Sequence, residues 1–241
     1  MTGARRNSQA TFWVTRTRPD NAGTVDRLRP YAQRVLAVPV LASHAIPSRW
    51  PAEPPDALVF TSINGVRYHQ AQPEFSSCPV LAVGDRTAQA ASSAGYSDVR
   101  SAGGDVRDLE RLVCDTIPRG RRILHLSARR PAGDLVGRLA SAGYDAKRLP
   151  VYATQPVSSA TLAQTLPSMT TIDGILIHSP RAGRLVRSFL ATTRSKFHGS
   201  IYCISHAAAA PFDGLLGVRV IAAAQPTEDA LLHLVAAASQ E

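Results

Sequence analysis

Hydroxyl side chains recur in this sequence at the ends of short apolar runs, directly before a segment with helical character. Five positions share this placement: Thr15, Ser62, Ser127, Ser179 and Ser205. In α/β sheets, ligands bind outside the carboxyl ends of parallel strands, where the free N–H groups of helix N-termini attract anions. The same hydroxyls are also suited to capping the helices that follow. Both interpretations stay open for each residue, and the recurrence favours a binding site for the set.

Arginines cluster near the same strand ends. The six positions are Arg16, Arg18, Arg86, Arg129, Arg130 and Arg181. The chain has 27 Lys and Arg against 18 Asp and Glu, a formal net charge of +9, and its only lysines are Lys147 and Lys196. A planar guanidinium group suits carboxylate or phosphate better than an ammonium group does. A pocket for a polyanion and a coding bias toward arginine both explain this excess.

The sequence lacks the motifs of the common metal and cofactor sites. Its 7 histidines have neither HxH nor HExxH spacing, and neither a P-loop nor a G-x-S-x-G elbow is present. Gly84 follows an apolar run, but one glycine there is not a dinucleotide fingerprint. We therefore expect no metal and no cofactor.

Composition also bears on partners and location. No helix-turn-helix or zinc-finger spacing is present, and aromatic residues make up only 6% of the chain, which argues against a nucleic-acid partner. No run approaches the about 18 apolar residues of a membrane span, and no secretory signal is recognisable. Cys78, Cys114 and Cys203 form no CxxC pair and are expected to be buried, reduced thiols. These features predict a cytoplasmic protein without a membrane partner.

The elements that position these residues come from a repeat. Residues 56–67 reappear as residues 173–184, displaced by 117 positions, and residues 12–40 resemble residues 122–151 with a displacement of 111. The same half therefore occurs twice, in permuted order. Two similar units facing each other imply a cleft where a sizeable ligand would bind.

Short apolar runs alternate with longer amphipathic stretches, which is typical of parallel sheets with helices on both faces. The expected strands are 12–16, 35–40, 57–61, 79–83, 98–101, 122–126, 146–151, 173–177, 200–204 and 218–222. The fold class is therefore α/β, with two similar lobes that are each a parallel sheet flanked by helices.

Two segments are expected to link the lobes. Residues 39–55 are rich in proline and lack periodicity, and residues 151–167 are rich in Ser, Thr and Pro. Cutting the chain there gives a discontinuous lobe 1 (12–38 plus 168–238) and a contiguous lobe 2 (56–150). Such a two-segment linker would permit opening and closing.

In order and spacing, several short motifs resemble the uroporphyrinogen-III synthase family over the chain from Val14 to about Val235. The matching runs are VTR (14–16), VFTSINGV (59–66), AVG (82–84) with TA (87–88), GY (95–96), LHL (124–126), AGY (142–144), PVY (150–152) and PTE (226–228). The bilobal fold of that family, joined by two linkers, agrees with the boundaries drawn above.

The resemblance implies a cofactor-free, cyclising hydro-lyase of porphyrin and haem biosynthesis. Its substrate would be hydroxymethylbilane, a linear tetrapyrrole with eight carboxylates, closed with inversion of ring D to give uroporphyrinogen III and water. Tyr152 matches by position the tyrosine that the family is thought to use in catalysis. The expected substrate-binding set, from the resemblance and the strand ends together, is Thr15, Arg16, Ser62, Asn64, Gly84, Arg86, Thr87, Ser127, Arg130, Ser179, Ser205 and His206.

One turn departs from the family pattern. Where the family usually has a Gly-Pro-Thr-Thr-like turn, residues 204–208 read Ile-Ser-His-Ala-Ala. Three alternatives stay open: Ser205 and His206 make the hydrogen bonds of the missing hydroxyls, this copy contributes only shape, or the protein has lost activity. The resemblance also suggests hydroxymethylbilane synthase as an upstream partner, and we expect a monomer.

Two other classes of function fit parts of the sequence. A non-catalytic bilobal binding protein or sensor for a small anionic metabolite would have the same two lobes and would bind without turnover. A basic nucleic-acid-associated protein would show binding that weakens steeply with salt, but the arginines of this chain gather near strand ends instead of along one helix.

Overall fold

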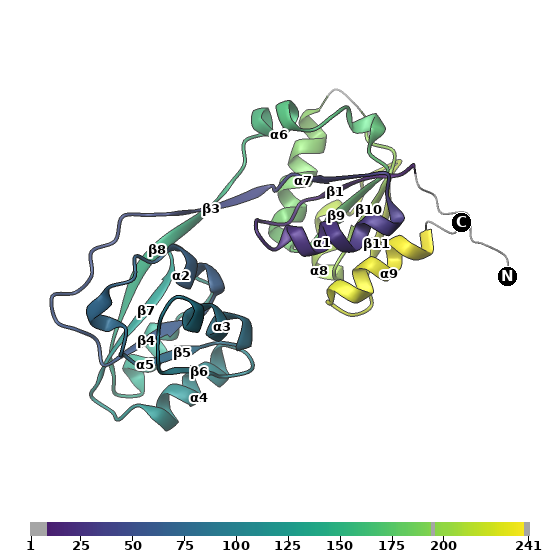
Figure 1. Cartoon of the computed structure of the whole chain (residues 1–241). Coiled ribbons are helices and arrows are strands. Elements are labelled where there is room, and N and C mark those ends of the chain that lie inside the picture. Colours follow the sequence, from purple (N-terminus) through teal and green to yellow (C-terminus); the bar gives the residue numbers. More distant parts are fainter. Residues whose placement is uncertain (1–8, 194–195, 239–241) are drawn as a thin grey trace. The chain divides into compact units, whose positions relative to one another are not determined.

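The structure is a computed structural model that describes residues 9–193 and 196–238 (Figure 1). Its contacts divide the chain into two compact units: unit 1 comprises Met1–Ala42 and Gln155–Glu241, and unit 2 comprises Ser43–Thr154. Each unit is an α/β sandwich with its own sheet and its own core. No helix within the described residues is long and apolar enough to cross a membrane.

Unit 1 contains a sheet of five strands in the order β11-β10-β9-β1-β2, and every pairing in it is parallel. The strands are β1 (Thr11–Val14), β2 (Arg34–Ala37), β9 (Gly174–Ile177), β10 (Ser200–Cys203) and β11 (Arg219–Ala222). The helices are α1 (Asn21–Leu28), η1 (Arg29–Tyr31), α6 (Ser159–Thr165), η3 (Met169–Thr171), α7 (Pro180–Thr192), α8 (His206–Ala209), η4 (Ala210–Phe212) and α9 (Glu228–Ala238).

Helices cover both faces of this sheet. On one face, Trp13, Ile175 and Ile201 pack with residues of α6, α7, α8 and η4. On the other, Phe12 and Leu176 pack with residues of α1 and α9. The strands are buried on both sides, which explains why β9 reads as a continuous apolar run instead of an alternating one.

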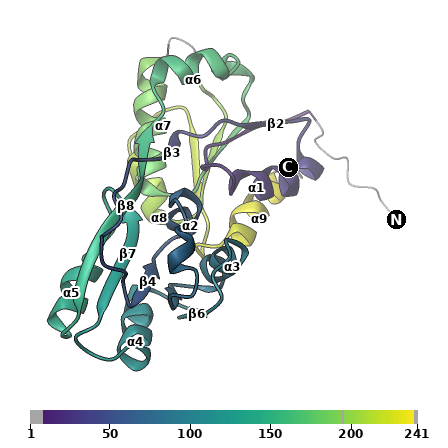
Figure 2. The same ribbon diagram turned by 60° about the vertical axis from the view of Figure 1, so that its left-hand side comes forward.

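Unit 2 has a sheet in the order β3-β8-β7-β4-β5-β6. The strands are β3 (Leu41–Ala45), β4 (Ala57–Phe60), β5 (Val80–Ala82), β6 (Val99–Ser101), β7 (Arg122–Ala128) and β8 (Asp145–Pro156). The helices are α2 (Ile63–Tyr68), η2 (Pro73–Phe75), α3 (Asp85–Ser93), α4 (Val106–Thr116) and α5 (Leu135–Ser141). Residues of α2 and α3 pack on one face of the sheet, and those of α4 and α5 pack on the other (Figure 2).

The strand β3 is absent from the sequence-based expectation. Three contacts place it antiparallel to β8: Val157 N donates to Val40 O (3.0 Å), the hydroxyls of Ser43 and Thr154 are 2.8 Å apart, and Ile46 N donates to Val151 O (3.0 Å). The two segments expected as linkers, 39–55 and 151–167, thus contain β3, the end of β8 and the helix α6. The chain crosses between the units through these two paired strands.

The permuted repeat appears in the sheet orders. Read as β2-β1-β9-β10-β11, the sheet of unit 1 matches β8-β7-β4-β5-β6 of unit 2 strand by strand. The displacement of 117 residues aligns β4 with β9, and the displacement of 111 aligns β7 with β1. The predicted α/β class, with parallel sheets flanked by helices, is confirmed, except that β3 adds an antiparallel edge strand.

Candidate functional site

In unit 2, the carboxyl end of β4 leads directly into a capped helix. Ser62 is the N-cap of α2, and its Oγ accepts a hydrogen bond from Asn64 N at 3.2 Å. The side-chain carbonyl of Asn64 in turn accepts from Arg67 at 2.7 Å. Gly65 lets this helix approach the sheet, because a Cβ at that position would lie 2.8 Å from the carbonyl oxygen of Leu126. Ser62 and Asn64 are therefore held close to the strand ends.

The next strand end, after β5, holds three more of the predicted residues. Gly84 is the N-cap of α3 and has extended backbone, and a Cβ there would meet nothing within 4 Å. Arg86, in the first turn of the helix, is exposed, and Thr87 is buried. This helix start leaves room for a ligand next to its backbone, because Gly84 carries no side chain.

Ser127 does not have the predicted role of a strand-end hydroxyl before a helix. It lies inside β7, is 1% exposed, and donates a hydrogen bond to the carbonyl of Ala128 at 3.0 Å. The helix that follows, α5, is capped instead by Asp134, which accepts from Gly137 N at 2.9 Å. Arg130 is exposed in the loop between them.

Tyr152 lies in β8 beside a β-bulge. Ser127 is paired with Pro150 and Ala128 with Tyr152, so Val151 is the extra residue of the bulged strand. Arg129 N donates to the carbonyl of Tyr152 at 2.7 Å. Bulges redirect side chains and are frequent beside active sites. Because of this bulge, the consecutive side chains Val151 and Tyr152 both join the cluster that packs against α2.

A small cavity of about 300 Å³ adjoins the carboxyl half of β7 and is lined by His125, Pro131, Gly133, Asp134, Leu135, Val136 and Arg148. His125 is 3% exposed, and its Nε2 lies 3.0 Å from Oγ1 of Thr61. Burial, with a smaller contribution from the charge of Arg148, lowers the pKa of His125 to about 4. The imidazole is therefore neutral at pH 7 and is fixed beside the end of β4.

In unit 1, two strand ends repeat the capping seen at Ser62. Ser179 caps α7 and accepts from Ala182 N at 3.1 Å, and Ser205 caps α8 and accepts from Ala208 N at 3.3 Å. His206, the first residue of α8, is exposed. At the altered turn, Ala208 is fully buried against the core, whereas Ala207 is exposed.

Thr15 and Arg16 follow β1 but do not begin a helix. Thr15 is 1% exposed, and its hydroxyl donates to the carbonyl of Leu176 at 2.6 Å, so its hydrogen bond is within the sheet. Arg16 forms an ion pair with Glu228 at 2.9 Å. The helix α1 starts only at Asn21. Of the five recurrent hydroxyls, Ser62, Ser179 and Ser205 are N-caps, and Thr15 and Ser127 are not.

Glu228 and His178 are functional candidates that the sequence-based set did not include. Oε1 of Glu228 accepts from Thr24, and Oε2 lies 2.9 Å from Arg16 and 3.2 Å from Nε2 of His178. Burial raises the pKa of Glu228, but the contacts with His178, Thr24 and Arg16 outweigh it and lower the pKa to about 2. Nδ1 of His178 is buried without a hydrogen-bond partner among the described residues. The only sequence signal was the placement of His178 and Glu228 directly after β9 and at the start of α9.

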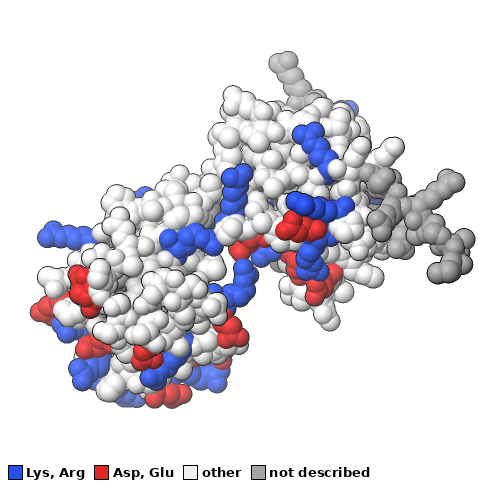
Figure 3. Space-filling view, viewed as in Figure 1, with Lys and Arg blue, Asp and Glu red and all other residues white. Residues whose placement is uncertain are grey.

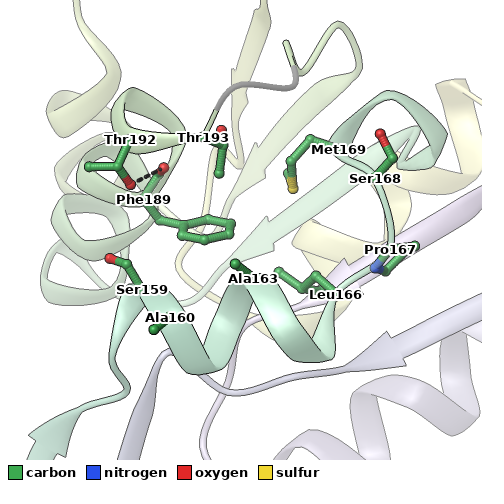
Figure 4. A pocket seen from close by; sticks show the side chains of 10 residues that line it. All are labelled: Ser159, Ala160, Ala163, Leu166, Pro167, Ser168, Met169, Phe189, Thr192 and Thr193. Atoms are coloured by element: carbon green, nitrogen blue, oxygen red, sulfur yellow. Dashed lines mark hydrogen bonds between the residues drawn. The ribbon is translucent and has the colours of Figure 1, made fainter.

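A cavity of about 470 Å³ in unit 1 is not lined by any of the predicted residues (Figure 4). Its lining includes the apolar side chains of Leu166, Met169 and Phe189 and the hydroxyls of Ser159 and Thr192. Since α7 begins at the carboxyl end of β9 and runs back, Phe189 and Thr192 at its far end lie toward the amino end of that strand. The position of this cavity, away from the carboxyl ends of the strands, therefore does not favour it as the ligand site.

The three cysteines differ in their exposure to solvent. Cys78 is half-buried, Cys203 is buried and Cys114 is exposed, so the expectation that all three thiols are buried is wrong for Cys114. Burial raises the pKa of Cys78 to about 11 and that of Cys203 to about 12. Within residues 9–193 and 196–238, no group of three or more His, Cys, Asp or Glu side chains is placed to hold a metal ion.

The two sheets have matching strand orders, formed from a permuted repeat, and helices begin at the ends of their strands. These features define a class of two-unit α/β proteins. The sequence model of uroporphyrinogen-III synthase HemD matches residues 24–233. This chain therefore belongs to the uroporphyrinogen-III synthase family, as the sequence motifs indicated.

Two solved structures agree with the fold. The uroporphyrinogen-III synthetase from Helicobacter pylori is 16% identical, covers 95% of this chain and 100% of its own, and has a TM-score of 0.65. A mutant uroporphyrinogen III synthase from Thermus thermophilus is 16% identical, covers 97% of this chain and 100% of its own, and has a TM-score of 0.51. Among curated protein sequences there is no significant match.

Proposed function

We propose that this chain closes hydroxymethylbilane to uroporphyrinogen III without a cofactor, as a lyase that releases water. The observation that carries the proposal is the match of the uroporphyrinogen-III synthase family over residues 24–233, which includes both strand-end segments of the permuted repeat. The family acts on a tetrapyrrole. The net charge of +9 agrees with a substrate that has eight carboxylates.

We assign Tyr152 as the acid that assists the first step. Its O–H donates a proton to the hydroxyl of the hydroxymethyl group, and the C–O bond breaks to release water. Loss of the pyrrole N–H proton then leaves a neutral azafulvene and balances the proton that the phenol donated. The substituted carbon of ring D then attacks that carbon to give a spiro intermediate, which reopens and closes with ring D inverted. Positioned proton transfer of this kind contributes about 10²–10⁴-fold to rate.

We assign the carboxylate contacts in each unit to the strand ends. In unit 2 these are the backbone at Gly84, the side chains of Asn64 and Thr87 and the exposed guanidinium groups of Arg86 and Arg130. In unit 1, Ser179, Ser205 and His206 begin helices. The capping serines accept hydrogen bonds from their helices, and each hydroxyl hydrogen remains available to donate to a carboxylate.

Thr15, Arg16 and Ser127 are assigned less direct roles. Thr15 and Ser127 donate to backbone carbonyls, and Arg16 is paired with Glu228, so these residues shape the strand ends. Conformational control is the main task, because without an enzyme the same substrate closes to the symmetric isomer I, and holding reactive carbons in one geometry selects the product.

The decisive experiment is the isomer ratio of the product. Purified protein receives hydroxymethylbilane, the product is oxidised, and uroporphyrins I and III are separated by chromatography. We expect mainly isomer III from the wild type, and a kcat about 10²-fold or more lower for Tyr152→Phe with little change in melting temperature. Isomer I alone at the rate of the blank, with substrate binding retained, would support the alternative of a non-catalytic binding protein or sensor.

We further propose that the protein works as a monomer in the cytoplasm, supplied by hydroxymethylbilane synthase. The free thiols support a reducing compartment, and an unstable substrate favours direct supply. Sedimentation at assay concentrations tests the monomer, and a mass twice that of the chain would contradict it.

A further inference from the structure

The ring of Tyr152 has one aromatic neighbour among the residues that the structure describes. The rings of Tyr68 and Tyr152 are stacked, with centroids 5.9 Å apart and planes inclined by 29°. Offset stacking at this distance is a favourable geometry for aromatic pairs. Tyr152 is 8% exposed and Tyr68 is half-buried. One face of the Tyr152 ring is thus covered by a second tyrosine from the same unit.

Tyr68 is itself fixed at both ends. It is the last residue of α2, whose position against the sheet is set by the close approach of Gly65 to Leu126. Its hydroxyl donates to the carbonyl of Ser43 in β3 at 2.8 Å. Ser43 in turn is bonded through its side chain to Thr154 in β8, at 2.8 Å. The ring of Tyr68 is therefore anchored to a helix and to the strand next to Tyr152.

The hydroxyl of Tyr152 has no comparable anchor. Its backbone carbonyl accepts from Arg129 N at 2.7 Å, but none of the described residues forms a hydrogen bond with its hydroxyl. The orientation of the ring therefore sets where the hydroxyl oxygen lies, and no hydrogen bond within the described residues directs its O–H. A phenol that donates to substrate needs this freedom of its hydroxyl together with a fixed ring.

We infer that Tyr68 is a positioning residue, which holds the ring of Tyr152 in the orientation for proton donation by stacking against it. This inference rests on the proposed role of Tyr152. The ring of Tyr68 is the part that positions Tyr152, and its hydrogen bond to Ser43 contributes less to that positioning.

The test compares Tyr68→Leu, Tyr68→Met and Tyr68→Phe with hydroxymethylbilane as substrate. We expect kcat to fall about tenfold or more in the Leu and Met variants with KM nearly unchanged, because misplacing a reacting group affects the chemical step. Tyr68→Phe keeps the stacked ring and should retain kcat within about twofold. Methionine fills the same space without a ring, so it provides a second measurement if the leucine variant does not fold.

Tyr31→Leu is the matched control. Tyr31 is also a half-buried tyrosine, but it lies in η1 of unit 1 and packs with a different cluster. Its replacement should reduce the melting temperature by a comparable amount and leave kcat unchanged.

A double-variant cycle separates positioning from an independent effect. In the Tyr152→Phe background, Tyr68→Leu should cause no further loss of kcat, because the proton that Tyr68 positions is already absent. An equal loss in both backgrounds would overturn the inference, as would full activity of Tyr68→Leu when Tyr152→Phe is slow. Full activity of Tyr152→Phe, or a wild type that forms no isomer III, would instead overturn the proposed function on which the inference rests.

Discussion

The carboxylate of Glu228 is held as an anion by side chains from three parts of unit 1. Arg16 follows β1, His178 follows β9 and Thr24 lies in α1, and all three contact the first residue of α9. A negative charge at a helix N-terminus is also favoured by the helix dipole. The guanidinium group of Arg16 therefore has a protein carboxylate as its partner, which ties the strand ends to the terminal helix.

This arrangement predicts a pH-dependent stability. The pKa of Glu228 is lowered from 4.5 to about 2 in the folded protein, so its stabilisation is present above the unfolded value and is lost as pH falls from about 4.5 to about 2. Glu228→Gln should reduce the free energy of unfolding by on the order of 1–3 kcal/mol at pH 7 and by roughly half as much near pH 3. Urea unfolding at the two pH values measures this.

Glu110→Gln provides the comparison for that experiment. Glu110 pairs with Arg138 at 2.8 Å, but the arginine side chain is 42% exposed, so its loss should cost no more than about 1 kcal/mol at either pH. Equal losses for the two variants at pH 7 would show that burial does not strengthen the Glu228 contacts.

At the level of helices, the N-cap serines allow structural and binding roles to be separated. Ser179 caps α7 and Ser158 caps α6, and each accepts a hydrogen bond at 3.1 Å from the residue three positions on. Replacing either serine with alanine should cost about 1 kcal/mol of stability. Only Ser179→Ala should raise KM for hydroxymethylbilane, because Ser158 is not among the strand-end residues assigned to substrate.

Thermal melts and steady-state kinetics of the two variants provide the measurement. If both variants keep the wild-type KM, the serine hydroxyl at position 179 acts only as a cap, and substrate binding there relies on the backbone.

The elements show which parts of the architecture the sequence could predict. Each of the ten expected strands overlaps an observed strand, because apolar runs such as β4 are buried on both faces of a sheet. The strand β3 was missed because only one of its five residues is buried, so it shows neither a continuous nor an alternating apolar pattern. The helix α6 was missed because its Ser- and Thr-rich sequence reads as a loop.

The site was predictable only where it depended on local sequence. The N-caps Ser62, Ser179 and Ser205 follow from a hydroxyl between a strand and a helix. The contact of Glu228 with Arg16 joins residues at opposite ends of the chain, and the stack of Tyr68 on Tyr152 depends on the bulge at Val151. No pattern of nearby residues encodes such contacts.

For the whole molecule, the repeat explains how one architecture is made twice. The two strands that complete each sheet precede the repeated half in unit 1 (β1 and β2) and follow it in unit 2 (β7 and β8), so unit 1 is discontinuous and unit 2 is contiguous. A repeat displaced by 117 residues in one half and 111 in the other is visible in the sequence, and it agrees with the matching strand orders of the two sheets.

The placement of charged side chains bears on the kind of partner that the protein binds. On the face of unit 2 seen in Figure 3, basic and acidic side chains alternate and do not form one basic surface. Several arginines are paired with acids, among them Arg100 with Asp98 and Arg122 with Glu53. This distribution does not favour a nucleic-acid backbone as the partner on that face. It suits a ligand whose charged groups are bound at a few separate positions.

The net charge of +9 nevertheless predicts salt-dependent binding of an eight-carboxylate substrate. Salt shortens the Debye length to about 10 Å at 0.1 M, so KM should rise severalfold between about 0.02 and about 0.3 M salt while kcat stays constant.

Arg130→Gln, in the loop after β7, should raise KM at low salt and reduce this dependence. Arg119→Gln removes the same charge on the amino side of β7, where Arg119 is also exposed, and should change neither. If both variants lower the salt dependence equally, long-range attraction accounts for the effect and Arg130 makes no direct contact; if KM is independent of salt, the carboxylates are bound through uncharged donors at the strand ends.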